Sequence, residues 1–346
     1  MSLKYAAIRS VFEVLAVTQV TGLVRALSRS RGVIFTLHRV LPGKPADFSP
    51  NAILQVTPDF LDYTIERVRD LGLDIVTLDE AIERIESPTA GRKFAVFTFD
   101  DAYRDNLRYA LPILRKRRCP FTLYVPTALV DGVGEVWWQA LEDIIAKQEA
   151  IAIEGEGGNT YLPTASTAEK HRAYNELYWH MRTMPEPERV VFIRKLGRDY
   201  GLDLDAHCRS LIMDWTELKT FAESALCTLG AHTVHHYELA KLPETEARDE
   251  IEQSMRIIAS QFGKTPEHLS YPIGGTASAA EREYRIARDL ALRSAVTTLP
   301  GGLYHADKDR LTALPRISLN GLFQAERYVD VFATGAVFSA MGRFAA

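Results

Sequence analysis

The stretch Arg92-Lys-Phe-Ala-Val-Phe-Thr-Phe-Asp-Asp101 runs six residues of strand type, Phe94 to Phe99, directly into two neighbouring carboxylates. Side chains alternate along a strand, so Asp100 and Asp101 are expected to point in different directions. One carboxylate could then bind a metal ion while the other accepts a proton. The alternative is that the two acids only end a strand in solvent or cap a helix.

A second strand-type run, Leu226-Cys-Thr-Leu-Gly-Ala231, is followed at once by His232-Thr-Val-His-His236. His232 and His236 are four residues apart, so a single helical turn would place both imidazoles on one face. Two imidazoles and a carboxylate are the ligands of a catalytic zinc-type site that keeps one position open for water. The alternative is a chance pair of histidines on a solvated helix.

Three motifs in this order resemble those of the polysaccharide deacetylases, the NodB-homology domain of carbohydrate esterase family 4. They are Thr98-Phe-Asp-Asp101, His232-Thr-x-x-His236 and Tyr271-Pro-Ile-Gly274, and the resemblance covers residues 32–128 and 214–321. It implies that Asp101, His232 and His236 bind one divalent metal ion and that Asp100 is the catalytic base. Zinc is the expected metal, with cobalt, manganese and nickel as alternatives.

The chain departs from the family pattern at several places. Ala102 stands where the family usually has Gly, and Tyr271 stands where it usually has Arg. Tyr-Pro-x-Gly is closer to the branch that deacetylates exopolysaccharide or biofilm glycans, and it implies that Tyr271 and Pro272 contact the substrate. No Asp-Trp-x-x-Pro motif follows the third motif. Arg316 could orient Asp100 in place of the missing arginine, or it could pair with an acid at the surface.

Two histidines are alternatives for the general acid that protonates the leaving amine. His305 ends Leu303-Tyr-His305, which matches a Leu-x-His motif of the family but lies out of order. His38 follows the first predicted strand, at the end where barrel sites are built, although it could serve only as a hydrogen-bonding residue there. A backbone N–H near Tyr124 could stabilise the oxyanion.

Strands and helices alternate along the chain in about seven units, which predicts a distorted (β/α)7-type barrel with a parallel sheet. The expected strands cover residues 33–37, 75–78, 94–99, 120–125, 226–231, 269–271 and 294–298. Residues 129–213 break the alternation and predict a mainly helical insertion beside the barrel mouth. Its Trp137, Trp138 and Trp179 could form a small core of their own or a platform for sugars.

Composition limits the remaining possibilities. The 346 residues are 47% hydrophobic and 25% charged, with a net charge of −4, so no strong basic field attracts nucleic acid. Cys119, Cys208 and Cys227 have no metal-binding spacing, and reduced thiols in a cytoplasmic protein explain them most simply. The oligomeric state is left open.

The N-terminal 30 residues are expected to form an amphipathic helix ahead of a single barrel domain over 31–346. Its apolar centre is interrupted by Glu13 and Gln19, which argues against a signal peptide. No stretch reaches the ~18 apolar residues of a spanning helix. The helix is therefore expected to pack on the domain or to lie on a membrane surface, with a peripheral membrane location as an alternative to a purely cytoplasmic one.

The sequence thus predicts a metal-dependent hydrolase that removes N-acetyl groups from amino sugars of a polysaccharide or oligosaccharide and releases acetate. A hydrolase of another carbon–nitrogen bond, such as a cyclic amide or imide, is one alternative on the same barrel. A non-catalytic glycan-binding relative is the other, although binding alone would not need the base Asp100.

Overall fold

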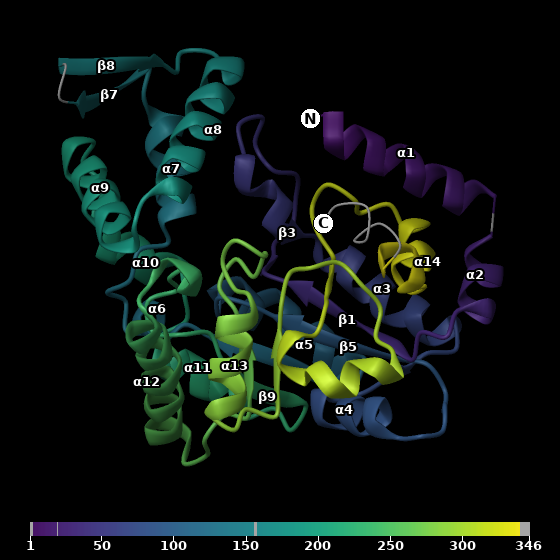
Figure 1. The fold of residues 1–346 in the computed structure, drawn as a ribbon. Coiled ribbons are helices and arrows are strands. Elements are labelled where there is room, and N and C mark those ends of the chain that lie inside the picture. Colours follow the sequence, from purple (N-terminus) through teal and green to yellow (C-terminus); the bar gives the residue numbers. More distant parts are fainter. Residues whose placement is uncertain (1–2, 19, 156–157, 340–346) are drawn as a thin grey trace.

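The computed structural model of the protein describes residues 3–18, 20–155 and 158–339 (Figure 1). The main sheet has eight parallel strands: the short β4 (Asp74–Ile75) pairs with β5, and the other seven follow the order β11-β10-β9-β6-β5-β1-β12. They are β1 (Gly32–Leu37), β5 (Phe94–Phe99), β6 (Phe121–Val125), β9 (Cys227–Ala231), β10 (His268–Ser270), β11 (Ser294–Val296) and β12 (Ile317–Ser318). The predicted α/β barrel class is confirmed.

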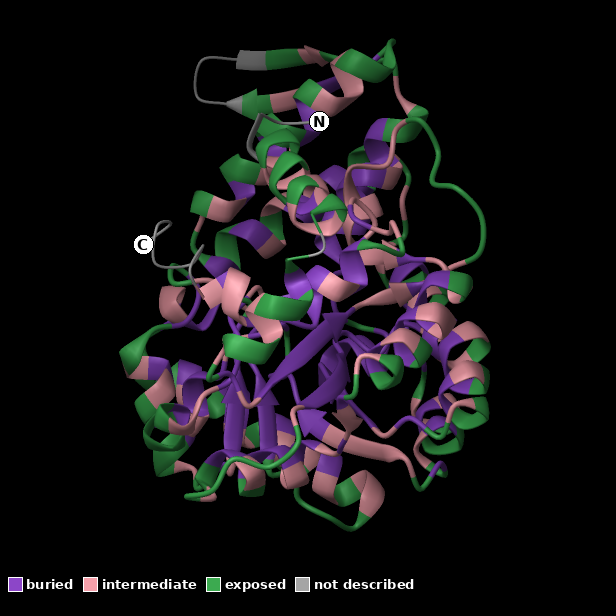
Figure 2. Cartoon of the chain, turned by 90° about the vertical axis from the view of Figure 1, so that its right-hand side faces the viewer, coloured by how far each residue is buried: buried purple, intermediate pink, exposed green. Residues whose placement is uncertain are grey.

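The sheet closes on itself through the residues that precede β12. Val296 in β11 forms a parallel bridge with Leu314, and the N–H of Leu314 donates to Ala295. Strand β12 then pairs with β1 through Ile317 and Ser318, the two residues that follow Arg316. Strands β1, β5, β6, β10 and β11 are buried over their whole length (Figure 2), as expected for a parallel sheet covered by helices.

Helices on the outside return the chain from one strand to the next. They are α3 (Pro58–Asp70), α4 (Leu78–Glu86), α5 (Leu111–Lys116), α11 (Trp215–Ala222), α12 (Glu244–Phe262) and α13 (Glu281–Asp289). The Oγ1 of Thr57 caps α3 by accepting from the N–H of Phe60, and Pro58 stands at the first helical position.

The predicted strand over 75–78 is wrong beyond Ile75. The pairing strand β4 is only Asp74–Ile75, because the Oγ1 of Thr77 accepts from the N–H of Glu80 and starts α4 there. A local side-chain cap therefore ends the extended segment earlier than the apolar pattern indicates.

The chain between β6 and β9 forms the mainly helical insertion, which stands to one side of the barrel in Figure 1. It contains α6 (Thr127–Val130), α7 (Trp137–Lys147), the hairpin β7 (Ala150–Gly155) and β8 (Gly158–Pro163), α8 (Thr167–Thr183), α9 (Glu186–Asp199) and α10 (Leu204–Leu211). Trp137 and Trp138 are buried, whereas Trp179 is 61% exposed, so the three tryptophans do not share one core.

The N-terminal segment contains two helices, α1 (Leu3–Val17) and α2 (Thr21–Leu27), instead of the single helix predicted over residues 1–30. Phe12 is buried from α1 among aromatic side chains from and around α14 (Tyr328–Phe332), including Phe323, Tyr328 and Phe332. Within the described residues, no single helix is long and apolar enough to cross a membrane. The α1–α2 pair has sufficient length and composition, but it is bent by 87°.

Candidate active site

Asp100 lies at the carboxyl end of β5 and is held by Arg316, which precedes β12. The Nη1 and Nη2 of Arg316 donate to the two carboxylate oxygens of Asp100 at 2.8 and 2.7 Å. Both side chains are almost completely buried. Burial alone would raise the pKa of Asp100, but the Arg316 guanidinium outweighs it and holds the pKa below its usual value. The Asp100 side chain is therefore a carboxylate at neutral pH.

Two hydroxyl groups complete this pair, and neither was singled out from the sequence. Ser270, the last residue of β10, donates its Oγ–H to Asp100 at 3.2 Å and accepts from Arg316 at 3.0 Å. Thr98 in β5 accepts from the other Nη atom of Arg316 at 3.1 Å. We call Asp100, Arg316, Ser270 and Thr98 the arginine side of the site.

Asp101, His232 and His236 converge beside it, and we call these three residues the histidine side. The Nε2 atoms of His232 and His236 lie 3.4 and 3.3 Å from the Oδ1 of Asp101. The three prospective ligand atoms are all within 4.8 Å of one another, and all three residues are buried. The Oδ1 of Asp101 has no hydrogen-bond partner among the described residues. A buried carboxylate oxygen facing two imidazole nitrogens fits a divalent metal ion.

The orientation of His232 is fixed by its second ring nitrogen. The Nδ1–H of His232 donates to the carbonyl oxygen of Ser270 at 2.6 Å. A carbonyl oxygen can only accept, so the proton is on Nδ1 and Nε2 keeps its lone pair toward Asp101. Ser270 therefore serves both sides: its hydroxyl contacts Asp100, and its carbonyl oxygen orients His232.

The two histidines do not come together through a helical turn, as the sequence reasoning proposed. Residues 232–236 form a bent loop in which Thr233 and His236 have positive φ angles of 61° and 58°. Asp101 and Ala102 are also left-handed, at 73° and 56°. These conformations are unfavourable for residues other than Gly and are found preferentially at functional sites. The left-handed backbone at Ala102 also explains why a Gly is the usual residue there.

His38 follows β1 and belongs to the same electrostatic environment. Burial lowers the pKa of His38, while the charges of Asp101 and Asp100 partly oppose this effect. Its backbone oxygen accepts from the side chain of Asn106 at 3.0 Å. The structure thus places His38 at the mouth of the barrel, where it is neutral near pH 7.

The structure does not bring His305 to this group. Its Nδ1 donates to the carbonyl oxygen of Ile85, near the end of α4, and its Nε2 lies 3.4 Å from Lys308. Helix α4 leads back to the start of β5, so His305 sits at the opposite end of the barrel from Asp100. The Leu-x-His match is misleading, because the segment after β11 returns to the amino-terminal ends of the strands before β12 begins.

Tyr271 and Tyr124 are both buried, and neither side chain is open to a substrate. The hydroxyl of Tyr271 donates to the carbonyl oxygen of Thr312 at 2.9 Å, and its ring packs against Tyr284 in α13, outside the barrel. The ring of Tyr124 lies inside the barrel, 5.8 Å from the Arg316 guanidinium. The outward direction of the Tyr271 side chain follows from the alternation of side chains along β10. Ser270 points into the barrel, so the next residue points outward. Pro272 is buried next to it.

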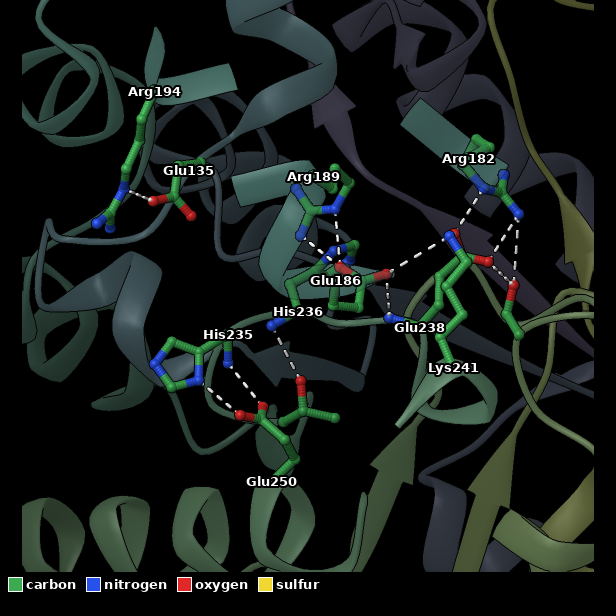
Figure 3. A network of polar contacts seen from close by, with 12 residues as sticks. Glu135, Arg182, Glu186, Arg189, Arg194, His235, His236, Glu238, Lys241 and Glu250 are labelled. Carbon is green, nitrogen blue, oxygen red and sulfur yellow. Dashed lines mark hydrogen bonds and ion pairs between the residues drawn. The ribbon is translucent and has the colours of Figure 1, made fainter. Parts of the chain in front are cut away.

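Hydrogen bonds and ion pairs connect the insertion to the loop that contains His236 (Figure 3). Arg182 from α8 makes a two-fold contact with Glu238 at 2.7 and 2.9 Å, and Glu186 in α9 accepts from the backbone N–H of Glu238. On the other side of the loop, His235 points away from His236 and contacts Glu250 of α12. The loop is thus held from the insertion and from the barrel at once.

Trp138 of the insertion also contacts the site, through His236, and so does more than the separate core or the sugar platform expected of it from the sequence. Its ring lies 4.9 Å from the ring of His236, and its Nε1–H donates to the hydroxyl of Tyr103 at 2.9 Å. Tyr103 follows Asp101 by two residues. Trp138 therefore packs between the segments that carry two of the three prospective metal ligands.

Comparison with known proteins agrees with this geometry. The family model described as "Polysaccharide deacetylase" matches residues 87–294, which include Asp100, Asp101, His232 and His236. The chain belongs to the polysaccharide deacetylase family, and it is a hydrolase that removes acyl groups from glycans. This confirms the family and the enzyme class predicted from the three motifs.

Several solved structures share the fold. The deacetylase PplD of Streptococcus pyogenes, in complex with acetate, is 17% identical, with a TM-score of 0.55 over 85% of this chain and 94% of that one. IcaB from Ammonifex degensii is 16% identical, with a TM-score of 0.54 over 87% and 97%. The BpsB deacetylase domain from Bordetella bronchiseptica is 16% identical, with a TM-score of 0.51 over 83% and 94%. No protein of curated function matches the chain in sequence.

Proposed function

We propose that the protein removes N-acetyl groups from amino-sugar residues of a polysaccharide or oligosaccharide, with one divalent metal ion held by Asp101, His232 and His236. The observation that carries the proposal is that two neighbouring carboxylates at the barrel mouth have different surroundings. The Oδ1 of Asp101 faces two imidazoles and has no hydrogen-bond partner among the described residues, whereas Asp100 is held in its charged form by Arg316. PplD and the BpsB domain, which share the fold, are deacetylases, and this supports the proposed reaction.

A divalent ion in this set of ligands would supply a Lewis acid for the acetamide carbonyl and lower the pKa of a water molecule. Side chains of the protein would carry out the proton transfers. Asp100 is the base that accepts the proton of the attacking water, since Arg316 keeps it ionised. His38, which is neutral near pH 7, could accept a proton within the site and deliver it to the leaving amine. The products are acetate and a free amino sugar.

The test is acetate release from N-acetylglucosamine oligomers by chelator-treated protein, before and after titration with Zn²⁺, Co²⁺, Mn²⁺ or Ni²⁺. We expect activity only after metal is restored, with a stoichiometry of one ion per chain. Opening of a cyclic imide without acetate release would favour the alternative hydrolase. Oligomer binding without any turnover would favour a glycan-binding protein.

A further inference from the structure

The two N-terminal helices present an apolar surface that nothing in the described structure covers. Ten large hydrophobic side chains are exposed among the described residues, and six of them lie in these two helices or, in the case of Val20, between them. They are Val11 (43% exposed), Val14 (61%), Val17 (72%), Val20 (37%), Leu23 (61%) and Leu27 (74%). Exposed apolar side chains gathered in one place usually mark a surface that contacts a partner or a membrane.

The exposed residues of α1 are uncharged, whereas its described acid, Glu13, is only partly exposed and pairs with Arg327. Its exposed residues are Ala6, Ala7, Ser10, Val11, Val14, Val17 and, just beyond the helix, Thr18. A helix that packs one face on a soluble protein normally turns charged and polar residues to water. Helix α1 instead buries Phe12 against the aromatic side chains around α14 and leaves a second apolar face outside.

Basic side chains follow this surface directly. Leu27 ends α2, and Ser28 begins the lining of a cavity of 130 Å³ that also contains Arg29, Arg31 and Lys93. The Nζ of Lys93 donates to the carbonyl oxygens of Ser28 and Ser30 at 2.9 and 2.6 Å, which fixes the cation at the cavity.

These positive charges are not neutralised by any carboxylate that the structure describes. No described carboxylate forms an ion pair with Arg25, Arg29, Arg31 or Lys93, although Arg84 and Arg92 on the same cavity wall both pair with Asp74. Residues 1–31 contain five basic side chains and one acidic one, in a chain whose net charge is −4. The charge at the end of the apolar surface is therefore opposite to that of the chain as a whole.

We propose that α1 and α2 lie in the surface of a membrane that contains anionic phospholipid, with their outer side chains among the acyl chains and the cations of residues 25–31 and Lys93 at the phosphates. An interfacial helix needs an apolar face and nearby basic residues, and both are present here. A nucleic acid would use the cations and leave the valines and leucines exposed. A transmembrane span would need α1 and α2 in line and would remove Phe12 from its aromatic contacts.

The experiment is co-sedimentation of the whole chain with phosphatidylcholine vesicles, with and without phosphatidylglycerol. We expect binding to the anionic vesicles that weakens with salt. The double variant Val14→Asp, Leu23→Asp should lower the partition coefficient by roughly 10-fold or more, because two apolar side chains lose their burial. Val191→Asp is the matched control, since Val191 is 66% exposed on α9 of the insertion and should leave binding unchanged.

The basic residues are tested separately. Arg25→Gln with Arg29→Gln should weaken binding to anionic vesicles by about 5-fold for each cation removed. Arg115→Gln, an exposed arginine on α5, is its control. Thermal unfolding and acetate release from a soluble oligomer should stay unchanged in every variant, which separates membrane binding from the active site.

Four results would overturn the proposal. The Asp variants could bind vesicles as well as the parent chain does. The parent could resist release by alkaline carbonate, which would indicate a span. Light scattering could show a dimer that dissociates in the Asp variants while vesicles remain unbound, which would assign the surface to a second copy of the chain. Inorganic phosphate that competes fully for the vesicles would also contradict a role for the apolar face.

Discussion

The arginine side and the histidine side contain the neighbouring residues Asp100 and Asp101, yet the carboxylate oxygens of these two residues differ in their hydrogen bonding. Both oxygens of Asp100 accept hydrogen bonds from Arg316, and Ser270 adds another. The Oδ1 of Asp101, in contrast, has no described hydrogen-bond partner and faces two imidazole nitrogens. Buried polar atoms are nearly always hydrogen-bonded, so the exception on the histidine side points to an external ligand.

This difference teaches how one dipeptide can supply two functions. Strand geometry turns Asp100 into the barrel toward Arg316, and the left-handed backbone at Asp101 turns the next carboxylate toward the histidines. The backbone conformation, which is unfavourable by itself, separates the two carboxylates in space and in charge environment.

The largest expected effect comes from removing a residue of the histidine side. Asp101→Asn and His236→Ala should each reduce metal affinity by more than the ~10²-fold that loss of an outer-shell partner costs, and acetate release should fall with it. Titration calorimetry measures the affinity. His235→Ala is the neighbouring control and should keep the metal, because His235 contacts Glu250 instead.

Removing the charge on the arginine side should separate chemistry from metal binding. Asp100→Asn should lower turnover ~10²–10⁴-fold, because an amide cannot accept the proton of the water. Its metal affinity should stay within a few-fold of the parent. If Asp100→Asn turned over substrate normally, or if it lost the metal, the two sides would not have the separate functions proposed for them.

Arg316→Gln should show its main effect on stability. It leaves the Asp100 carboxylate buried without its partner, and breaking a buried ion pair costs about 3–5 kcal/mol of unfolding free energy. Urea unfolding at neutral pH measures the loss. Arg327→Gln, which removes an exposed pair with Glu13, should have a clearly smaller effect.

The pH dependence of that loss has a defined sign. The pKa of Asp100 is depressed in the folded chain, so the stability it provides is present above its unfolded pKa of ~3.9 and is lost as pH falls through the folded value. In Arg316→Gln the penalty of burying the carboxylate disappears on protonation. Without Arg316, burial raises the pKa of Asp100 in the variant above ~3.9, so the difference between the two proteins should begin to shrink before the pH falls to ~3.9 and should continue to shrink below it. A constant gap would mean that Arg316 acts mainly through packing.

Ser270→Ala should give the smallest effect. It removes a hydroxyl that contacts both Asp100 and Arg316, which is worth about 1 kcal/mol, but keeps the carbonyl oxygen that orients His232. We expect a loss of turnover of roughly 10-fold or less and an unchanged metal affinity. A large loss of metal would show that the hydroxyl, and not only the carbonyl oxygen, supports the histidine side.

Much of the barrel and the central residues of the site could be predicted from local patterns. Asp100, Asp101, His232 and His236 all follow strand-type runs, and the carboxyl ends of parallel strands meet at one rim. The alternation of strands and helices likewise predicts a parallel barrel. These properties depend on short stretches of the chain, so the sequence contains them directly.

The partners of these residues depend on distant segments and were harder to predict. Ser270 lies 170 residues from Asp100 in the chain, and a serine before Tyr271 carries no charge pattern. Its position at the end of β10 could have indicated that Ser270, and not Tyr271, points inward. The path of the chain after β11, which takes His305 to the wrong end of the barrel, follows from sheet closure and from no local motif.

The contact between Trp138 and His236 gives the protein an internal optical reporter. The indole ring lies 4.9 Å from an imidazole of the prospective metal site, within range of electronic quenching by an ion with a partly filled d shell. Co²⁺ or Ni²⁺ bound at that imidazole should quench the tryptophan fluorescence, whereas Zn²⁺ should leave its intensity unchanged. Exchange of one ion for another could then be followed in real time on the unlabelled chain, with no glycan present.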